Sequence, residues 1–123
     1  MSTDMGVWLK IVEDAVSWLA NEEGQRRAWF GTGPEIDTPD EAFMGFLDDA
    51  AVEDFLKHKD TGLYPNQLDL LQDLAEMVRK LCIETNKEGR LPPTFIDDPR
   101  WQKVIAAAKK TKGLLDMKVI TKK

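Results

Sequence analysis

The sequence predicts an all-α protein, a single domain of residues 1–123 in which about five helices surround a central helix near residues 65–85. Its length of 123 residues suits one hydrophobic core, and 42% of the residues are apolar, which is typical of a globular chain. Several long segments repeat apolar residues at the spacing of a helix turn. Between residues 68 and 83 the apolar residues fill a continuous half of the helix circumference, which is wide enough to contact elements on two sides.

The first thirty residues predict one long helix and one short helical turn. Apolar residues three and four positions apart indicate an amphipathic helix from about Asp4 to Asn21. Glu22 would fall within its apolar face, so we expect the helix to end or bend there, with Gly24 as a stop. The segment from Gln25 to Phe30 is predicted to form a short helical turn that places one of its two aromatic residues on the core.

The tetrapeptide Thr-Pro-Asp-Glu at positions 38–41 is the strongest local signal for a helix start. A threonine at the N-cap, a proline at the first helical position and a glutamate at the third form a capping box. Further along, the apolar pattern of this helix changes phase. We therefore predict a break at Asp48 and Asp49, one of which caps a second short helix that ends near His58.

Two further helix starts lie in the second half of the chain. A turn at residues 61–62 is expected to precede Pro65, which opens the central helix. Asp98, followed by a proline, repeats the cap-and-proline pattern and opens the last helix.

The C-terminal segment is harder to assign. The last helix is expected to end at Gly113, because Lys112 falls on its apolar stripe. Residues 114–120 are compatible with a docked extension, a short strand or a continuation of the helix. Residues 118–123 are expected to form a frayed basic tail.

Few residues suggest catalytic or metal chemistry. The single histidine, His58, lies between two lysines at a predicted helix end, where we expect it to be solvated. The single cysteine, Cys82, lies on the apolar face of the central helix and is expected to be a small buried residue. The sequence contains no zinc-ligand cluster, calcium loop or glycine-rich phosphate loop. We therefore predict no catalytic residue, no metal and no cofactor, and a protein that is not an enzyme.

Charge is distributed unevenly along the chain. Residues 1–98 carry 21 acidic and nine basic side chains, whereas residues 99–123 carry one acidic and eight basic. The basic segment could contact nucleic acid, but it can also lie against the acidic body of its own domain, so nucleic-acid binding is the less favoured interpretation. The sequence has neither a signal-peptide pattern nor an apolar run long enough to span a membrane, so we expect a cytoplasmic protein without membrane contact.

The segment 35–60 concentrates nine acidic side chains against two lysines. We predict that it contacts a basic protein partner, and that Glu53 and Asp54 contribute to this contact without a structural duty. Two tryptophans at the margins of their apolar faces are candidate aromatic contacts. The predicted binding residues are Glu35, Asp37, Asp48, Asp49, Glu53, Asp54, Trp18 and Trp29.

A small, acidic, helical chain of this kind resembles in general character the bacterial immunity proteins and antitoxins that block a basic nuclease toxin. The resemblance rests on composition, and it implies an inhibitor that neutralises a toxin by direct contact. The alternative is a small enzyme or regulator whose carboxylates meet only in the fold. A deep polar pocket of converging carboxylates would favour this alternative, whereas a flat or shallow acidic surface with exposed aromatic residues would favour the binding protein. The sequence leaves the partner and the oligomeric state open.

Overall fold

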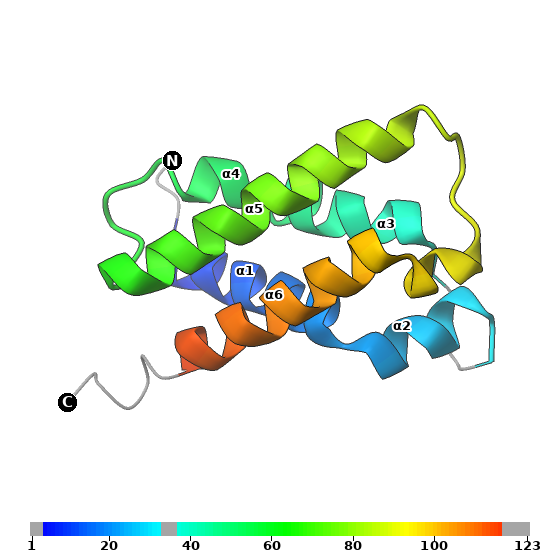
Figure 1. Ribbon diagram of the computed structural model, residues 1–123. Coiled ribbons are helices and arrows are strands. Elements are labelled where there is room, and N and C mark those ends of the chain that lie inside the picture. The colour runs from blue at the N-terminus through cyan, green and yellow to red at the C-terminus, as the bar shows by residue number, and fades with distance from the viewer. Residues whose placement is uncertain (1–3, 33–36, 117–123) are drawn as a thin grey trace.

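The computed structural model describes residues 4–32 and 37–116, and every regular element within them is a helix (Figure 1). The predicted all-α fold class is therefore confirmed. None of the described helices combines the length and the apolar composition needed to cross a bilayer. In chain order the elements are α1 (Met5–Ala20), α2 (Glu22–Trp29), α3 (Pro39–Met44), the π-helix η1 (Gly45–Asp49), α4 (Val52–Phe55), α5 (Pro65–Asn86), the 3-10 helix η2 (Pro93–Asp97) and α6 (Pro99–Asp116).

The described elements form a bundle in which one member is a broken helix. α6 packs between α1 and α5, and the broken member, made of α3, η1 and α4, uses η1 and α4 to pack against α1 and α5. α2 and η2 contact each other at one end of the bundle (Figure 1). α5 thus contacts α6 on one flank and the broken helix on the other, as the width of its apolar face predicted. It shares the centre of the bundle with α6, which contacts both α1 and α5.

The apolar faces of these helices meet in one hydrophobic core. Both apolar stripes of α5 contribute to it: Leu71, Ala75 and Val78 of one stripe are buried, as are Leu74 and Leu81 of the other. Full burial of a leucine or valine side chain contributes roughly 1.5–3 kcal/mol, so this helix face accounts for a large part of the folding free energy.

Three helices begin with a side-chain cap; those at Thr38 and Asp98 were predicted from the sequence, whereas Asp4 was predicted only as the approximate start of its helix. The Asp4 carboxylate accepts backbone N–H groups in the first turn of α1. The N–H of Glu41 donates to Oγ1 of Thr38 at 3.1 Å, and the N–H of Arg100 donates to the carboxylate of Asp98 at 2.8 Å. The three helices therefore begin where predicted, because each start depends only on neighbouring residues.

The predicted stop at Gly24 is wrong. The chain bends at Asn21, whose side chain accepts the N–H of Gly24 at 2.9 Å, and α2 already begins at Glu22. A Cβ on Gly24 would come within 2.6 Å of the Asn21 side chain and 3.0 Å of the Trp18 ring. This buried glycine serves close packing rather than helix termination.

The predicted end of α6 at Gly113 is also wrong. The hydroxyl of Thr111 donates to the backbone carbonyl one turn earlier at 2.8 Å, so this polar residue is buried inside the helix, and Leu115 is buried beyond it. Packing of this continued stripe outweighs the cost of about 1 kcal/mol for a glycine within a helix. Residues 114–116 are thus a continuation of the helix, and residues 117–123, with the predicted basic tail, lie outside the described residues.

The break in the broken helix lies at Ala51 rather than at the two preceding aspartates. In η1 the N–H of Ala50 donates to the carbonyl of Gly45 at 3.0 Å, and Ala51 then adopts a left-handed conformation with φ 49° and ψ 50°. The predicted cap by Asp48 or Asp49 is wrong, because Ala51 is the N-cap of α4 and no side chain caps this helix. The π turn and the left-handed residue together allow the apolar residues on both sides of the break to reach the core.

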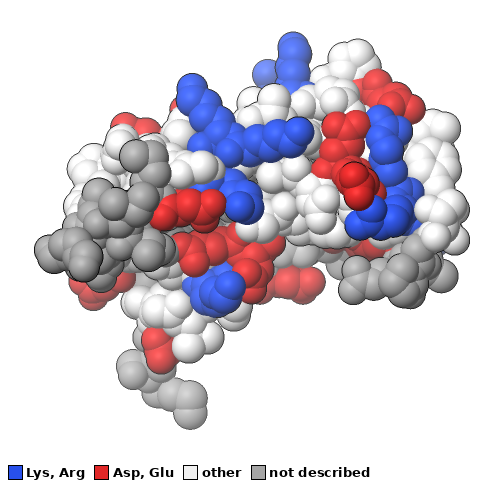
Figure 2. Space-filling model, turned by 90° about the horizontal axis from the view of Figure 1, so that it is seen from below, with Lys and Arg blue, Asp and Glu red and all other residues white. Residues whose placement is uncertain are grey.

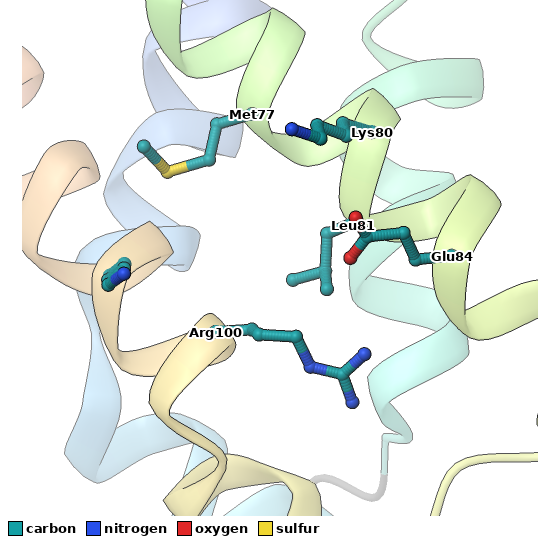
Figure 3. Close-up of a pocket in the computed structure, with 6 residues that line it drawn as sticks. Met77, Lys80, Leu81, Glu84 and Arg100 are labelled. Atoms are coloured by element: carbon teal, nitrogen blue, oxygen red, sulfur yellow. The ribbon is translucent and has the colours of Figure 1, made fainter.

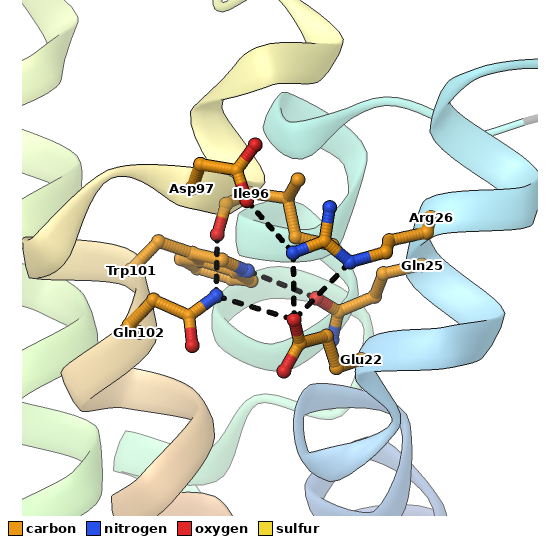
Figure 4. Close-up of polar contacts among 7 residues, drawn as sticks. All are labelled: Glu22, Gln25, Arg26, Ile96, Asp97, Trp101 and Gln102. Atoms are coloured by element: carbon orange, nitrogen blue, oxygen red, sulfur yellow. Dashed lines mark hydrogen bonds and ion pairs between the residues drawn. The ribbon is translucent and has the colours of Figure 1, made fainter.

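A buried glutamine joins α1, α2 and α6 (Figure 4). Nε2 of Gln25 donates to the carbonyl oxygens of Trp18 and Leu19, at 2.7 and 3.0 Å, at the end of α1. Oε1 of Gln25 accepts the indole N–H of Trp101 at 2.9 Å. The fully buried amide therefore has partners for both its donor and its acceptor atoms.

An ion-pair group extends this contact to η2 (Figure 4). The guanidinium of Arg26 donates to Glu22 at 2.8 Å and to Asp97 at 2.7 Å. Gln102 of α6 donates to the carbonyl of Ile96 at 2.6 Å. Together with the buried glutamine, these residues form what we call the α2–α6 polar network.

Candidate interaction surface

The acidic segment predicted as a contact surface forms the broken helix of the bundle. Four of its carboxylates lie on η1 and α4, and we call this group the acidic ridge: Asp48, Asp49, Glu53 and Asp54. Glu53 is half-buried, whereas the other three are exposed. Asp49 makes no ion pair within the described part of the chain. The ridge is therefore accessible to a partner.

An arginine from α5 holds Glu53. The guanidinium of Arg79 donates two hydrogen bonds to the Glu53 carboxylate, at 2.6 and 3.2 Å, and so joins α5 to α4. These hydrogen bonds keep the pKa of the Glu53 carboxyl below its ordinary value of 4.5. The prediction that Glu53 has no structural duty is therefore wrong. Its partner lies 26 positions away, so the pairing depends on the fold.

An open groove runs beside this ion pair, between α4 and α5. Its volume is about 270 Å³. Asp54, on α4 next to Glu53, pairs with Lys57 at 3.5 Å and with no other cation among the described residues, and both side chains are more than two-thirds exposed. Exposed pairs of this kind contribute little to stability, so the Asp54 carboxylate stays available. The groove is lined by Glu53, Leu56, Lys57, Gln72, Ala75 and Glu76.

The backbone beneath the ridge is supported from α1. The indole N–H of Trp8 donates to the carbonyl of Ala50 at 2.8 Å, and its ring packs edge-on against Phe55 and the exposed His58. A left-handed conformation costs a residue such as Ala51 roughly 1–2 kcal/mol. Strained residues and π turns of this kind cluster at functional sites. The backbone of the ridge is therefore, besides its charge, a second property that is typical of a functional site.

Apolar side chains are exposed next to the ridge. Met44, one helix turn from both Asp40 and Asp48, is 53% exposed, and Ile83 on α5 is 59% exposed. Burial raises the pKa of the half-buried Cys82 thiol, the charge of Arg79 opposes this rise, and the charges of Asp48 and Asp40 add to it. Exposed apolar side chains thus lie on α3, which leads into the ridge, and on α5, which anchors Glu53 of the ridge through Arg79.

Of the two remaining predicted acidic residues, the structure describes Asp37, which lies outside the ridge. Asp37 precedes α3, and burial together with the neighbouring Glu41 carboxyl raises the pKa of Asp37, while a hydrogen bond with Trp18 opposes the rise. The half-buried Trp18 thus contacts a carboxylate rather than the ridge. Glu35 lies outside the described residues.

The predicted contact role of Trp29 is wrong. Its side chain is 5% exposed, and its ring lies 5.5 Å from the ring of Trp101 in the core. The sequence left open which of the two aromatic residues of this helical turn packs onto the core, and the structure shows that it is Trp29, whereas Phe30 is exposed. Trp29 therefore cannot contribute an accessible surface.

Sequence reasoning missed two residues of this surface. Arg79 lies on the polar half of the central helix, so its spacing predicts a solvated side chain, whereas in the structure it anchors Glu53. Met44 directly follows the buried Phe43 and gave no separate signal. Ile83 did give one, because it is the apolar residue that falls within the polar half of the central helix.

The charges elsewhere are more mixed. Figure 2 shows basic and acidic side chains interleaved over the lower face of the molecule. Within the described residues, no group of three or more His, Cys, Asp or Glu side chains could hold a metal ion. The acidic ridge therefore differs from the mixed surface elsewhere in both its composition and its position, and we take it as the candidate interaction surface.

No known protein family, curated protein or solved structure matches the chain.

Proposed function

We propose that this protein is a non-enzymatic acidic binding module of the immunity or antitoxin type, which neutralises a basic toxin or nuclease in the bacterial cytoplasm. The observation that supports this proposal is the accessible acidic ridge, together with the exposed apolar side chains Met44 and Ile83 on the helices α3 and α5. An apolar surface bordered by charged residues is typical of protein contact sites.

The carboxylates of the ridge would act mainly on the rate of association. Asp48, Asp49 and Asp54 are solvated, so they attract a basic partner over a distance without a large desolvation cost. Added salt screens this attraction, and the association rate should therefore fall as the salt concentration rises. Glu53 contributes differently, because its contact with Arg79 fixes α4 against α5.

The proposal is tested by affinity capture from an extract of the source organism with the full chain as bait. The ridge variant carries Asp49→Lys and Asp54→Lys, which leave the Glu53–Arg79 pair intact. The control variant carries Glu23→Lys and Asp116→Lys, which change the net charge equally and also remove exposed ion pairs. We expect a basic protein that binds the wild type and the control but not the ridge variant.

The contradicting results are equally specific. A captured protein that is acidic, or one that binds the ridge variant as well as the wild type, would place the contact elsewhere. Thermal melting of both variants provides the folding check. We expect their melting temperatures to lie close to that of the wild type, because substitutions of exposed residues usually change stability by less than about 0.5 kcal/mol.

A further inference from the structure

A second hollow lies on the other flank of α5, between α5 and α6 (Figure 3). Gln67 near the start of α5 donates to the carbonyl of Leu114 near the end of α6 at 3.0 Å, so the two helices run antiparallel. The hollow lies where the last turns of α5 pass the first turns of α6. Its volume is about 280 Å³, and it is lined by Met77, Lys80, Leu81, Glu84, Arg100 and Lys103.

The floor of this hollow is apolar. Leu81 is only 4% exposed and forms a fixed base, whereas the neighbouring Met77 is 36% exposed. Methionine has a flexible and polarizable side chain that adapts to the shape of a ligand. An apolar group placed here would be removed from water on several sides.

The rim of the hollow is mainly cationic. Lys80 from α5 and Lys103 from α6 face the hollow from its two walls, and neither makes a hydrogen bond or an ion pair within the described residues. Glu84 is the one carboxylate among the six lining residues. Two lysines without partners on a chain of net charge −5 are a local exception to its acidic character.

The third cation of the rim is held in place. The guanidinium of Arg100 donates to Asp98 at 2.8 and 3.1 Å and to Glu88 at 3.2 Å, and it lies over the ring of Phe95. These contacts compensate its charge and fix its position, so it forms a rigid wall. The free charges that can respond to a ligand are those of the two lysines.

We propose that the hollow between α5 and α6 binds a small amphiphilic carboxylate, with its apolar body on Met77 and Leu81 and its carboxylate between Lys80 and Lys103. At roughly 30 Å³ per non-hydrogen atom, the hollow accommodates a ligand of about ten such atoms. A small hydrophilic anion would leave the apolar floor in contact with water. A neutral apolar molecule would leave the two ammonium groups without a counter-charge.

The first experiment titrates the full chain with octanoate and, separately, with octan-1-ol, using calorimetry. Both probes have an eight-carbon chain, and only octanoate is charged. We expect saturable binding of octanoate with a Kd of about 0.1–1 mM, and binding of octan-1-ol that is at least about fivefold weaker. Equal binding of the two probes, or no saturable binding of octanoate, would overturn the proposal.

Variants then locate the site. Lys80→Gln with Lys103→Gln should weaken octanoate binding at least about fivefold, whereas octan-1-ol binding should stay unchanged. The control, Lys59→Gln with Lys109→Gln, removes the same charge outside the hollow and should leave both affinities unchanged. If the control weakens octanoate as much as the rim variant, the effect is one of net charge and the proposed site is wrong.

The rim carboxylate supplies a test in the opposite direction. Glu84 repels a bound carboxylate, so Glu84→Gln should strengthen octanoate binding by about twofold and leave octan-1-ol binding unchanged. If Glu84 had a merely structural role, its substitution would change the binding of octanoate and of octan-1-ol to the same extent. Unchanged or weaker octanoate binding in a variant that melts like the wild type would contradict the proposed position of the carboxylate.

Discussion

The α2–α6 polar network and the acidic ridge both gather polar side chains at helix ends, but they differ in how completely these groups are paired. In the network, Gln25 uses both its donor and its acceptor atoms, and Arg26 bridges two carboxylates. On the ridge, Asp49 has no ion pair within the described residues and Asp54 has one exposed contact.

This difference separates a structural region from a candidate functional one. A buried polar group without a partner costs about 1–3 kcal/mol, so each hydrogen bond of the buried glutamine stabilises this end of the bundle. Exposed carboxylates have no such requirement, because water solvates them. The ridge also contains the π turn and the left-handed Ala51, which are less favourable than a regular helix. Substitutions in the two regions should therefore affect different properties.

The largest expected effect is that of Gln25→Leu. The substitution leaves the indole N–H of Trp101 and the carbonyl of Leu19 without their Gln25 partner inside the core, while the carbonyl of Trp18 still accepts the N–H of Asn21, so the free energy of unfolding should fall by about 3 kcal/mol. Urea denaturation measures this change. The control is Gln102→Leu, which removes the half-buried contact with Ile96 and should cost about 1 kcal/mol. Equal losses in the two variants would contradict the special role of the buried amide.

A smaller effect is expected for Glu53→Gln, which breaks the ion pair with Arg79. Both side chains are about 40% exposed, so the loss should be only about 0.5–1 kcal/mol at neutral pH. The pKa of Glu53 is lowered in the folded state, so its stabilising effect is complete well above pH 4.5 and disappears as the pH falls through the folded-state pKa. Urea denaturation should therefore show a difference in the free energy of unfolding between variant and wild type that shrinks as the pH falls. A difference that is constant from pH 7 to pH 3 would show that the charge is not involved.

The strained residue allows a prediction of opposite sign. Ala51→Gly removes the Cβ that disfavours the left-handed conformation, although glycine loses more backbone entropy on folding. We expect a net gain in the free energy of unfolding of about 0.5 kcal/mol. Thermal melting and urea denaturation measure this gain, and a clear loss would contradict the left-handed backbone at this residue.

The smallest effect concerns Asp37, whose pKa is raised by burial and by the Glu41 carboxyl. A raised pKa means that the ionised form is disfavoured in the folded state, so the cost is absent below the ordinary value of 3.8 and grows as the pH rises through the folded-state pKa. Asp37→Asn should therefore raise the free energy of unfolding at pH 7 by less than about 0.5 kcal/mol, with a slight rise in the melting temperature, and should leave both unchanged near pH 3. If the gain in stability persists at pH 3, it does not come from the ionisation of Asp37.

Features with local causes could be predicted from the sequence. The starts of α1, α3 and α6 depend on Asp4, Thr38 and Asp98, whose side chains bond to backbone groups two or three residues away. The buried face of α5 follows from its apolar periodicity. These predictions required no knowledge of which helices are neighbours.

Features that depend on neighbouring helices could not be predicted in this way. Gly113 lies inside α6 because packing of Leu115 outweighs local preference. Predictions for the candidate site were the least accurate, because the interaction partners of Glu53 and Trp29 lie far away in the sequence. Sequence reasoning identified the acidic segment, but only the fold separates the anchored carboxylate from the exposed ones.

The most direct test of the central claim is the association rate between the captured basic partner and the protein, measured by stopped flow at about 20 and 200 mM salt. We expect Asp49→Lys with Asp54→Lys to reduce the rate by about tenfold or more at low salt, and by less at high salt, where charges are screened. The control Glu23→Lys with Asp116→Lys should stay within about twofold of the wild type. An association rate that is insensitive to salt, or that falls equally in both variants, would contradict the assignment of the acidic ridge as the contact surface.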